Sequence, residues 1–431
     1  MNSPNDILGP PGRRVYPNGL TLLHQRLPHR ASVALGVWLR AGSRDEPAER
    51  AGATHFLEHM LFKGTARRNA YDISASLESL GGHLDAFTAR EHVCYYGRAL
   101  DEHLPQALDV LADVVGHSTL PEDELEREKE VVREEIFSYE DSPEEKVQDL
   151  LSEALWGEDP LGRPILGTEE SVGAFTRADL GAFYAGRYHP GNLVVAVSGS
   201  FDPAWLEDAV GAAFAQPAGL PVELATVRDA QPTRTIYAPK DVSQLHLALA
   251  RPALANDSPE RYRLAVLATI VGGGMSSRLF QTLREQRGLA YSVYASTDSY
   301  RDAGMLSIAL GVKPARGAEA LEALAKELER FVAEGPTDEE LDSGKAQMRG
   351  SLLLGEESVS NHMYHLALDE LAYGKYIPLS THLDEVAGVT REQVMELAQR
   401  FFTPEGWTVA AVGPTSAEKF VRDGARALGG A

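Results

Sequence analysis

The chain has 431 residues, of which 43% are hydrophobic and 24% are charged. This composition is typical of a globular protein with two or three domains, and it excludes a disordered or fibrous chain. The formal net charge of −22 argues against nucleic acid as the main partner, because phosphate binding requires clustered Lys and Arg. The charge fits general solubility, the simpler reading, or an acidic chamber that concentrates basic peptides.

The first 19 residues, MNSPNDILGPPGRRVYPNG, lack the apolar core of a signal peptide. Asp6 and the small number of basic residues also disfavour an organelle transit sequence. No apolar run approaches the roughly 18 residues that span a bilayer. We therefore expect a cytoplasmic protein with a short, loose N-terminal arm and no membrane partner.

Strands are predicted where apolar residues run or alternate. Residues 31–39 (ASVALGVWL) form such a segment, and residues 243–249 (SQLHLAL) look like its counterpart later in the chain. The single cysteine, Cys94, lies in the apolar run 92–96. We interpret Cys94 as a buried strand residue rather than a catalytic thiol, and one cysteine excludes an intrachain disulfide or a Cys-rich zinc site.

A helix of about ten residues is predicted within residues 52–64, closed by Gly64. His55 and His59 are four positions apart, so both imidazoles project from one face. At that spacing two neutral ring nitrogens can meet one Zn²⁺ at about 2.0–2.1 Å. Glu58, three residues after His55, projects from the same side of the helix and is placed to contact a metal-bound water rather than the metal. Taken alone, the two histidines could also be polar residues near a surface.

A charged helix is predicted over residues 122–139, with Pro121 at its start. Catalytic zinc usually takes three protein ligands and leaves one position open. Four carboxylates of this helix are candidates for the third ligand: Glu128, Glu130, Glu134 and Glu135. Glu128 and Glu135 are seven positions apart and share a face, so one can bind the metal while the other supports a ligand from behind.

The chain repeats itself once. Residues 120–129 resemble residues 336–345, and residues 175–199 resemble residues 389–413. The two offsets, 216 and 214 positions, are nearly equal, which indicates a duplication rather than a solenoid.

Three segments follow from this duplication. Residues 1–218 are predicted to form an N-terminal metal-binding domain, residues 219–232 a Pro-rich linker and residues 233–431 a homologous C-terminal domain. The order of strands and helices in each half favours α+β domains over a doubly wound parallel sheet.

These residues resemble a known family. The motif HxxEH is the inverted form of the HExxH zinc motif. His55–Thr65 (HFLEHMLFKGT) is similar to the zinc helix of the pitrilysin and insulysin superfamily, especially its branch with the processing-peptidase β subunit. Residues 81–92, 128–136 and 277–291 resemble its substrate strand, its third-ligand helix and its second-domain segment. The resemblance spans nearly the whole chain and implies two homologous domains, each a mostly antiparallel sheet packed with helices.

The resemblance also implies roles for individual residues at a zinc site. They are His55, His59 and Glu135 as zinc ligands, Glu58 as the general base and Glu128 as a carboxylate behind the ligands. Glu134 is the fallback for the third ligand.

The resemblance further implies substrate-binding groups. Arg284 and Tyr291, seven positions apart in the second domain, are expected to grip the substrate carbonyl and its oxyanion. Without the resemblance they would be interpreted as a surface Arg and a buried strand Tyr. The substrate strand contributes Asp85, Ala86, Phe87 and Thr88. Asp85 stands where the family usually has Asn, and an ionised Asp accepts hydrogen bonds without donating them.

The sequence therefore predicts a zinc-dependent endopeptidase that cleaves peptides or unfolded segments inside a dimeric chamber. The alternative is a non-catalytic or partner-dependent subunit of a heterodimeric processing-peptidase-like complex. The intact HxxEH motif favours activity. Since larger relatives join two halves of this size, we expect a homodimer in which Arg284 and Tyr291 serve the zinc of the other subunit, or a heterodimer with an inactive homologue.

Overall fold

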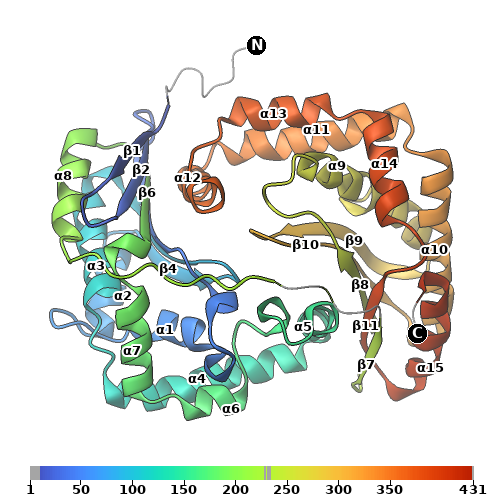
Figure 1. The fold of residues 1–431 in the computed structure, drawn as a ribbon, viewed down its shortest axis with the longest axis horizontal. Coiled ribbons are helices and arrows are strands. Elements are labelled where there is room, and N and C mark those ends of the chain that lie inside the picture. Colours follow the sequence, from blue (N-terminus) through green and yellow to red (C-terminus); the bar gives the residue numbers. More distant parts are fainter. Residues whose placement is uncertain (1–9, 228–229, 231–233, 430–431) are drawn as a thin grey trace. The chain divides into compact units, whose positions relative to one another are not determined.

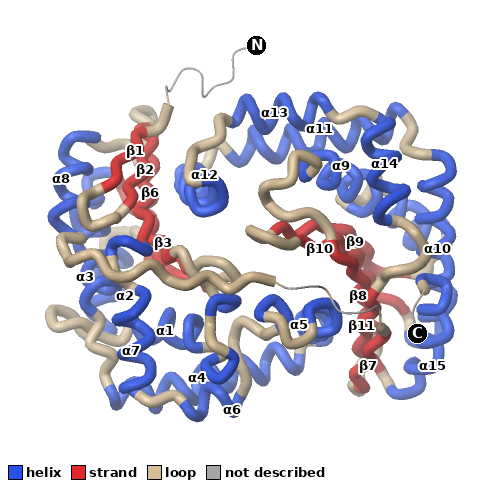
Figure 2. Tube along the Cα trace, in the orientation of Figure 1, coloured by secondary structure: helices blue, strands red, loops and turns tan. Residues whose placement is uncertain are grey.

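A computed structural model describes residues 10–227, 230 and 234–429 of the chain. The chain divides into two compact units, each containing one mixed sheet packed with helices (Figures 1 and 2). Unit 1 comprises Met1–Ile136, Pro164–Ala225 and Leu353–Ser380, and unit 2 comprises Phe137–Arg163, Thr226–Leu352 and Thr381–Ala431. The predicted α+β class is confirmed.

Unit 1 is built on a sheet with the strand order β1-β2-β6-β3-β5-β4. Only β2 and β6 pair in parallel; the other neighbours are antiparallel. Its strands are β1 (Gly12–Val15), β2 (Thr21–Arg26), β3 (Ser32–Leu39), β4 (His83–Thr88), β5 (Val93–Leu100) and β6 (Leu193–Gly199). Its helices are α1 (Ala53–Leu61), α2 (Ala70–Glu78), α3 (Leu104–His117), most of α4 (Glu122–Asp141), α6 (Glu169–Ala174), α7 (Arg177–Arg187), α8 (Pro203–Ala213) and α12 (Val359–Tyr373).

Unit 2 repeats this plan with the strand order β7-β11-β8-β10-β9. Again one pair, β7 and β11, is parallel. Its strands are β7 (Thr235–Pro239), β8 (Leu245–Pro252), β9 (Ala290–Ser299), β10 (Gly304–Val312) and β11 (Thr408–Gly413). Its helices include α5 (Pro143–Trp156), α9 (Arg261–Gly272), a π-helix (Phe280–Gln286), α10 (Gly317–Glu334), most of α11 (Asp338–Gly355), α13 (Leu379–Gly388), α14 (Arg391–Phe401) and α15 (Glu418–Ala425).

The central strand β3 shows why its sequence is apolar throughout. Val33, Leu35 and Val37 point into the core beneath α1 and α3, whereas Ala34 and Trp38 point to the opposite face. That second face is covered by α12, which packs on β3 and β6. A strand with both faces covered has no exposed side, so polar alternation disappears.

Unit 2 uses the same two-faced arrangement. Leu245, Leu247 and Leu249 of β8 enter one core, and Ala248 and Ala250 enter a second core against α5. The two equivalent helices are therefore exchanged: α5 of the first half covers the sheet of unit 2, and α12 of the second half covers that of unit 1. The compact units thus have bounds different from the contiguous domains 1–218 and 233–431 predicted from the sequence.

The structure describes part of the predicted linker, and it tests the expectations for membrane helices and for Cys94. Residues 219–227 and 230 of the predicted linker have no regular secondary structure, and residues 228, 229, 231 and 232 lie outside the described residues. The expected N-terminal arm, residues 1–9, also lies outside them. No helix in the described part of the chain is long and apolar enough to cross a membrane. The buried strand position predicted for Cys94 is confirmed, since it lies in β5 and is 0% exposed.

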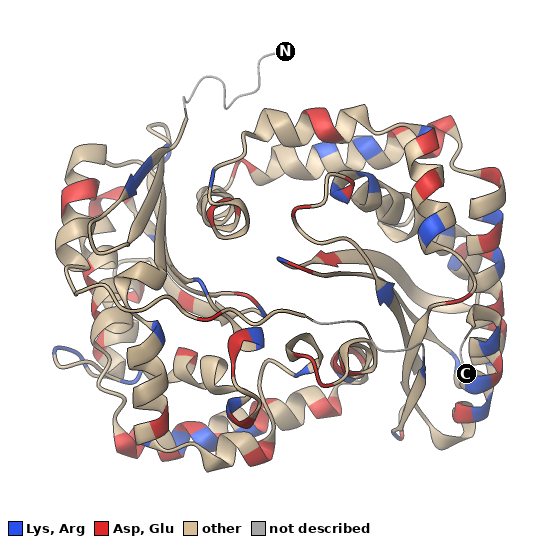
Figure 3. Ribbon diagram, in the orientation of Figure 1, with Lys and Arg blue, Asp and Glu red and all other residues tan. Residues whose placement is uncertain are grey.

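Both acidic and basic residues occur along α4 (Figure 3). Lys129 pairs with Glu126 at 2.9 Å and Arg133 with Glu130 at 2.5 Å, both at i,i+3 spacing. Such pairs stabilise a helix that has few apolar residues by roughly 0.2–0.5 kcal/mol each. The charged helix predicted over residues 122–139 is confirmed.

Candidate metal centre

Helix α1 carries the HxxEH motif and is fixed at its start by a buried carboxylate. Glu46, which is 5% exposed, accepts hydrogen bonds from the backbone N–H groups of Gly52 at 2.8 Å and Thr54 at 2.6 Å. The positive φ of Gly52, 91°, lets the chain turn into the helix there. Glu46 thus satisfies N–H groups that the first turn leaves without helical partners.

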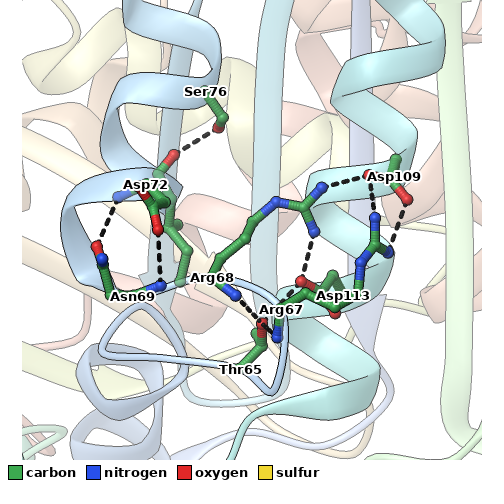
Figure 4. A network of polar contacts seen from close by, with 9 residues as sticks. Thr65, Arg67, Arg68, Asn69, Asp72, Ser76, Asp109 and Asp113 are labelled. Carbon is green, nitrogen blue, oxygen red and sulfur yellow. Dashed lines mark hydrogen bonds and ion pairs between the residues drawn. The ribbon is translucent and has the colours of Figure 1, made fainter.

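The helix ends at Leu61, earlier than the predicted closure by Gly64. Gly64 forms a β-bridge with Asn69, and Thr65 forms one with Ser118, so the chain has already left the helix. A polar network then fastens this loop to α3 (Figure 4). The carboxylate of Asp113, which is 2% exposed, accepts hydrogen bonds from Thr65 at 2.8 Å and Arg68 at 2.5 Å.

A cluster of three metal-ligand side chains lies between α1 and α4. Its members are His55, His59 and Glu135, whose ligand atoms all lie within 4.8 Å of one another. The Oε2 atom of Glu135 is 3.6 Å from Nε2 of His55 and 3.6 Å from Nε2 of His59. The imidazoles are 12% and 18% exposed, and the carboxylate is 39% exposed, so the cluster opens to solvent on one side.

The donor set suits a zinc ion. Two ligands about 2.1 Å from zinc at a tetrahedral angle are roughly 3.4 Å apart, close to the observed 3.6 Å. Burial, with the neighbouring His59, lowers the pKa of His55 to about 3, which keeps its imidazole neutral and able to bind a cation. The fallback ligand Glu134 is exposed and lies outside the cluster.

Glu128 supports the cluster from behind. Its Oε2 atom accepts a hydrogen bond from Nδ1 of His59 at 3.0 Å, and its Oε1 atom lies 2.5 Å from Nζ of Lys63. Burial raises the pKa of Glu128, but the bonds from His59 and Lys63 outweigh it and leave the pKa lowered. Burial likewise lowers the pKa of His59, but Glu128, Glu135 and Glu58 raise it overall. The same carboxylates would stabilise a cation held at Nε2 of His59.

Glu58 lies beside the cluster and is oriented by the edge strand. The hydroxyl of Thr88, at the end of β4, donates a hydrogen bond to Oε2 of Glu58 at 2.5 Å. Burial raises the pKa of Glu58, and the Thr88 bond offsets part of that shift. A half-buried carboxylate held in a fixed direction beside a metal site is suited to accept and return protons.

The predicted substrate residues lie on β4, the edge strand of the unit 1 sheet. Asp85 and Phe87 face the α12 side of the sheet, where Phe87 packs on Trp38. Asp85 accepts hydrogen bonds from Tyr96 at 3.3 Å and from the backbone N–H of Ala86 at 2.8 Å. An edge strand presents unpaired backbone groups on which an extended peptide can pair.

Arg284 and Tyr291 belong to unit 2, whereas the residues of the metal cluster belong to unit 1. Arg284 lies in the π-helix, and its guanidinium is 5.6 Å from the ring centroid of Tyr291 at the start of β9. Tyr291 is 71% exposed, which contradicts the alternative interpretation as a buried strand Tyr. The structure therefore brings the two residues of this pair together within unit 2.

Sequence reasoning missed three contributions to the site. Lys63 contacts Glu128, Glu46 caps α1, and Thr88 orients Glu58 in addition to its predicted place on the substrate strand. Lys63 carried one usable signal, because it lies four residues after His59 and so extends the same helical face. Glu46 lies six and eight residues before the N–H groups that it accepts from, and Thr88 lies 30 residues after Glu58, so neither contact follows a helical or strand spacing.

The fold and the cluster together define a duplicated α+β protein with a His-His-Glu metal site on an inverted HxxEH motif. The family model described as Insulinase (Peptidase family M16) matches residues 21–169, and the model described as Peptidase M16 inactive domain matches residues 174–348. The chain belongs to this family, peptidase family M16, as its sequence motifs predicted.

Relatives in several bacteria agree with this assignment. An uncharacterized zinc protease of Mycobacterium leprae is 40% identical, over 94% of this chain and 92% of its own length. Uncharacterized zinc protease YmxG of Bacillus subtilis is 41% identical, over 92% and 97%. Among solved structures, a protease from Helicobacter pylori has a TM-score of 0.88 at 23% identity, covering 94% of this chain and 100% of that one, which supports the fold.

Proposed function

We propose that this protein is a zinc metalloendopeptidase that cleaves peptides or unfolded segments. The observation that carries the proposal is the convergence of His55, His59 and Glu135, with Glu58 beside them. Zinc proteases among the relatives support the metal and the reaction class. His55, His59 and Glu135 would hold the ion, leaving one position open for catalysis.

When bound, zinc would supply Lewis acidity and lower the pKa of a water molecule towards 7. Glu58 accepts the proton of the attacking water and later delivers it to the leaving amine. Thr88 holds the Glu58 carboxylate in place for both transfers. The scissile peptide pairs with the main chain of β4 near Asp85–Thr88, which gives affinity with loose sequence preference.

Arg284 and Tyr291 are proposed to donate hydrogen bonds to the oxyanion of the substrate. Their exposure, 41% for the Arg284 side chain and 71% for Tyr291, leaves them free to contact a peptide. We propose that the protein is a homodimer in which each chain supplies this pair to the metal site of the other. A heterodimer with an inactive homologue is the second possibility.

Mixed dimers test the action of this pair between chains. Glu58→Gln and Tyr291→Phe subunits, each inactive alone, are combined and the mixed dimers are isolated with two different affinity tags. If Arg284 and Tyr291 of one chain serve the metal site of the other, one of the two sites in each mixed dimer is intact, and cleavage should return to about half of the wild-type rate. Mixed dimers with no recovered cleavage would contradict it.

Metal dependence tests the reaction class. Purified protein is stripped with a chelator, and cleavage of a quenched fluorescent peptide is followed as zinc is returned. Activity should disappear on stripping and return at about one zinc per chain. A zinc-loaded chain that cleaves no peptide alone but does so with a homologous partner would instead indicate a subunit of a heterodimeric complex.

A further inference from the structure

The two oxygens of Glu128 are both engaged. This carboxylate is 3% exposed; Oε2 receives the Nδ1–H of His59 at 3.0 Å and Oε1 lies 2.5 Å from Nζ of Lys63. Because each oxygen has its own partner, the carboxylate cannot rotate without breaking one of the two contacts. Lys63 therefore sets the direction in which Glu128 meets His59.

The backbone of Lys63 is fixed from both sides. Its N–H donates to the carbonyl of Met60 in the last turn of α1 at 3.2 Å. The carbonyl of the next residue, Gly64, accepts from the N–H of Thr119 at 3.0 Å, just before α4 begins. The Thr65–Asp113 bond of Figure 4 fastens the following residue to α3. The ammonium group thus starts from a fixed point between the metal helix and the helix that carries Glu128.

The consequence reaches the metal ligand through a chain of contacts. With Nδ1 of His59 donating to Glu128, Nε2 carries the free lone pair of the ring and lies 3.6 Å from Oε2 of Glu135. A carboxylate behind a ligating histidine fixes both the tautomer and the ring orientation. If Glu128 turned, His59 would lose both constraints.

We propose that Lys63 is a positioning residue of the metal site, which holds Glu128 so that His59 presents Nε2 to the metal. The inference rests on the proposed function, because it assigns Lys63 a part in zinc binding. A purely structural role, in which Lys63 only balances a buried charge, predicts lower stability with unchanged zinc affinity. Zinc affinity of the folded protein therefore separates the two roles.

The experiment measures zinc affinity by competition with a chromophoric chelator, using the full-length protein at a temperature where circular dichroism shows it folded. Lys63→Met keeps the length of the side chain and removes the cation. We expect its zinc affinity to fall by about tenfold, the lower end of the range for loss of such supporting contacts. Lys63→Arg, which keeps a cation beside Glu128, should lose less than Lys63→Met.

Lys129→Met is the matched control, because Lys129 is also a mostly buried lysine in an ion pair, with Glu126 on α4. It should bind zinc as the wild type does. If Lys63→Met does not fold, Lys63→Gln is measured in its place. Unchanged zinc affinity in the folded Lys63 variant overturns the inference. A wild-type protein that binds no zinc overturns the proposed function itself, so the two failures are distinguishable.

Discussion

Replacing Thr88 with Val removes the hydroxyl that donates to Glu58 while keeping a β-branched residue on β4. The backbone pairing of Thr88 with Val93 does not involve the side chain and should persist. The variant therefore isolates the orientation of the general base from the binding of a peptide to the strand.

The magnitude follows from the bond itself. A hydrogen bond to a charged group is worth about 1.5–3 kcal/mol. Since about 1.4 kcal/mol corresponds to a factor of ten in rate, full loss of this orientation would lower kcat by roughly 10- to 100-fold. The KM for peptide should change little, because the proposed pairing of the substrate uses the main chain of β4 and not the Thr88 hydroxyl.

Steady-state cleavage of a quenched peptide by zinc-loaded protein measures this effect. Thr235→Val is the control, because Thr235 is also a strand threonine, on β7, and its hydroxyl has no hydrogen-bond partner in the described structure. The control should keep wild-type kcat. A Thr88→Val protein with full zinc content and at least half of the wild-type kcat would refute the orienting role of Thr88.

Three further variants test other parts of the structure. Glu135→Gln should weaken zinc binding by more than about 100-fold, measured by chelator competition, since a ligand matters more than its supporting groups. Met363→Ala, at a fully buried position of α12, should lower the free energy of unfolding by about 2–5 kcal/mol in urea titrations. Burial raises the pKa of Glu370, but the hydrogen bonds from Arg13 and Arg40 outweigh burial and leave the pKa lowered. The ionised carboxylate therefore stabilises the folded state above pH about 4.3, the pKa of an unfolded Glu, and this contribution is lost as the pH falls through the lowered value. Glu370→Gln should therefore destabilise the protein at pH 7 and progressively less below pH about 4 in unfolding measured across pH; an effect independent of pH would contradict this.

The local elements of the fold could be predicted because their patterns are local. The apolar run at β3 and the charged run of α4 each follow from the period of their own residues. The shared face of His55 and His59 follows from helical spacing in the same way. The choice of Glu135 over Glu134 depended on the family resemblance; in the structure Glu135 lies 3.6 Å from both histidines and Glu134 lies outside the cluster.

The exchange of α5 and α12 could not be predicted. An apolar helix face predicts that the helix packs against another element. Each sheet offers a similar apolar surface, so the pattern does not predict which sheet the helix covers. The contacts of Thr88 with Glu58 and of Lys63 with Glu128 likewise depend on how segments far apart in sequence meet. The cytoplasmic location and the dimer remain predictions.

The most direct test of a zinc site served by Glu58 is a paired measurement on wild type and Glu58→Gln. Zinc content is determined for both proteins, and cleavage of the same quenched peptide is compared. We predict about one zinc per chain in both, with cleavage lowered at least 100-fold in Glu58→Gln because the proton acceptor is lost. Equal cleavage by the two zinc-loaded proteins would contradict the assignment of Glu58 as the general base.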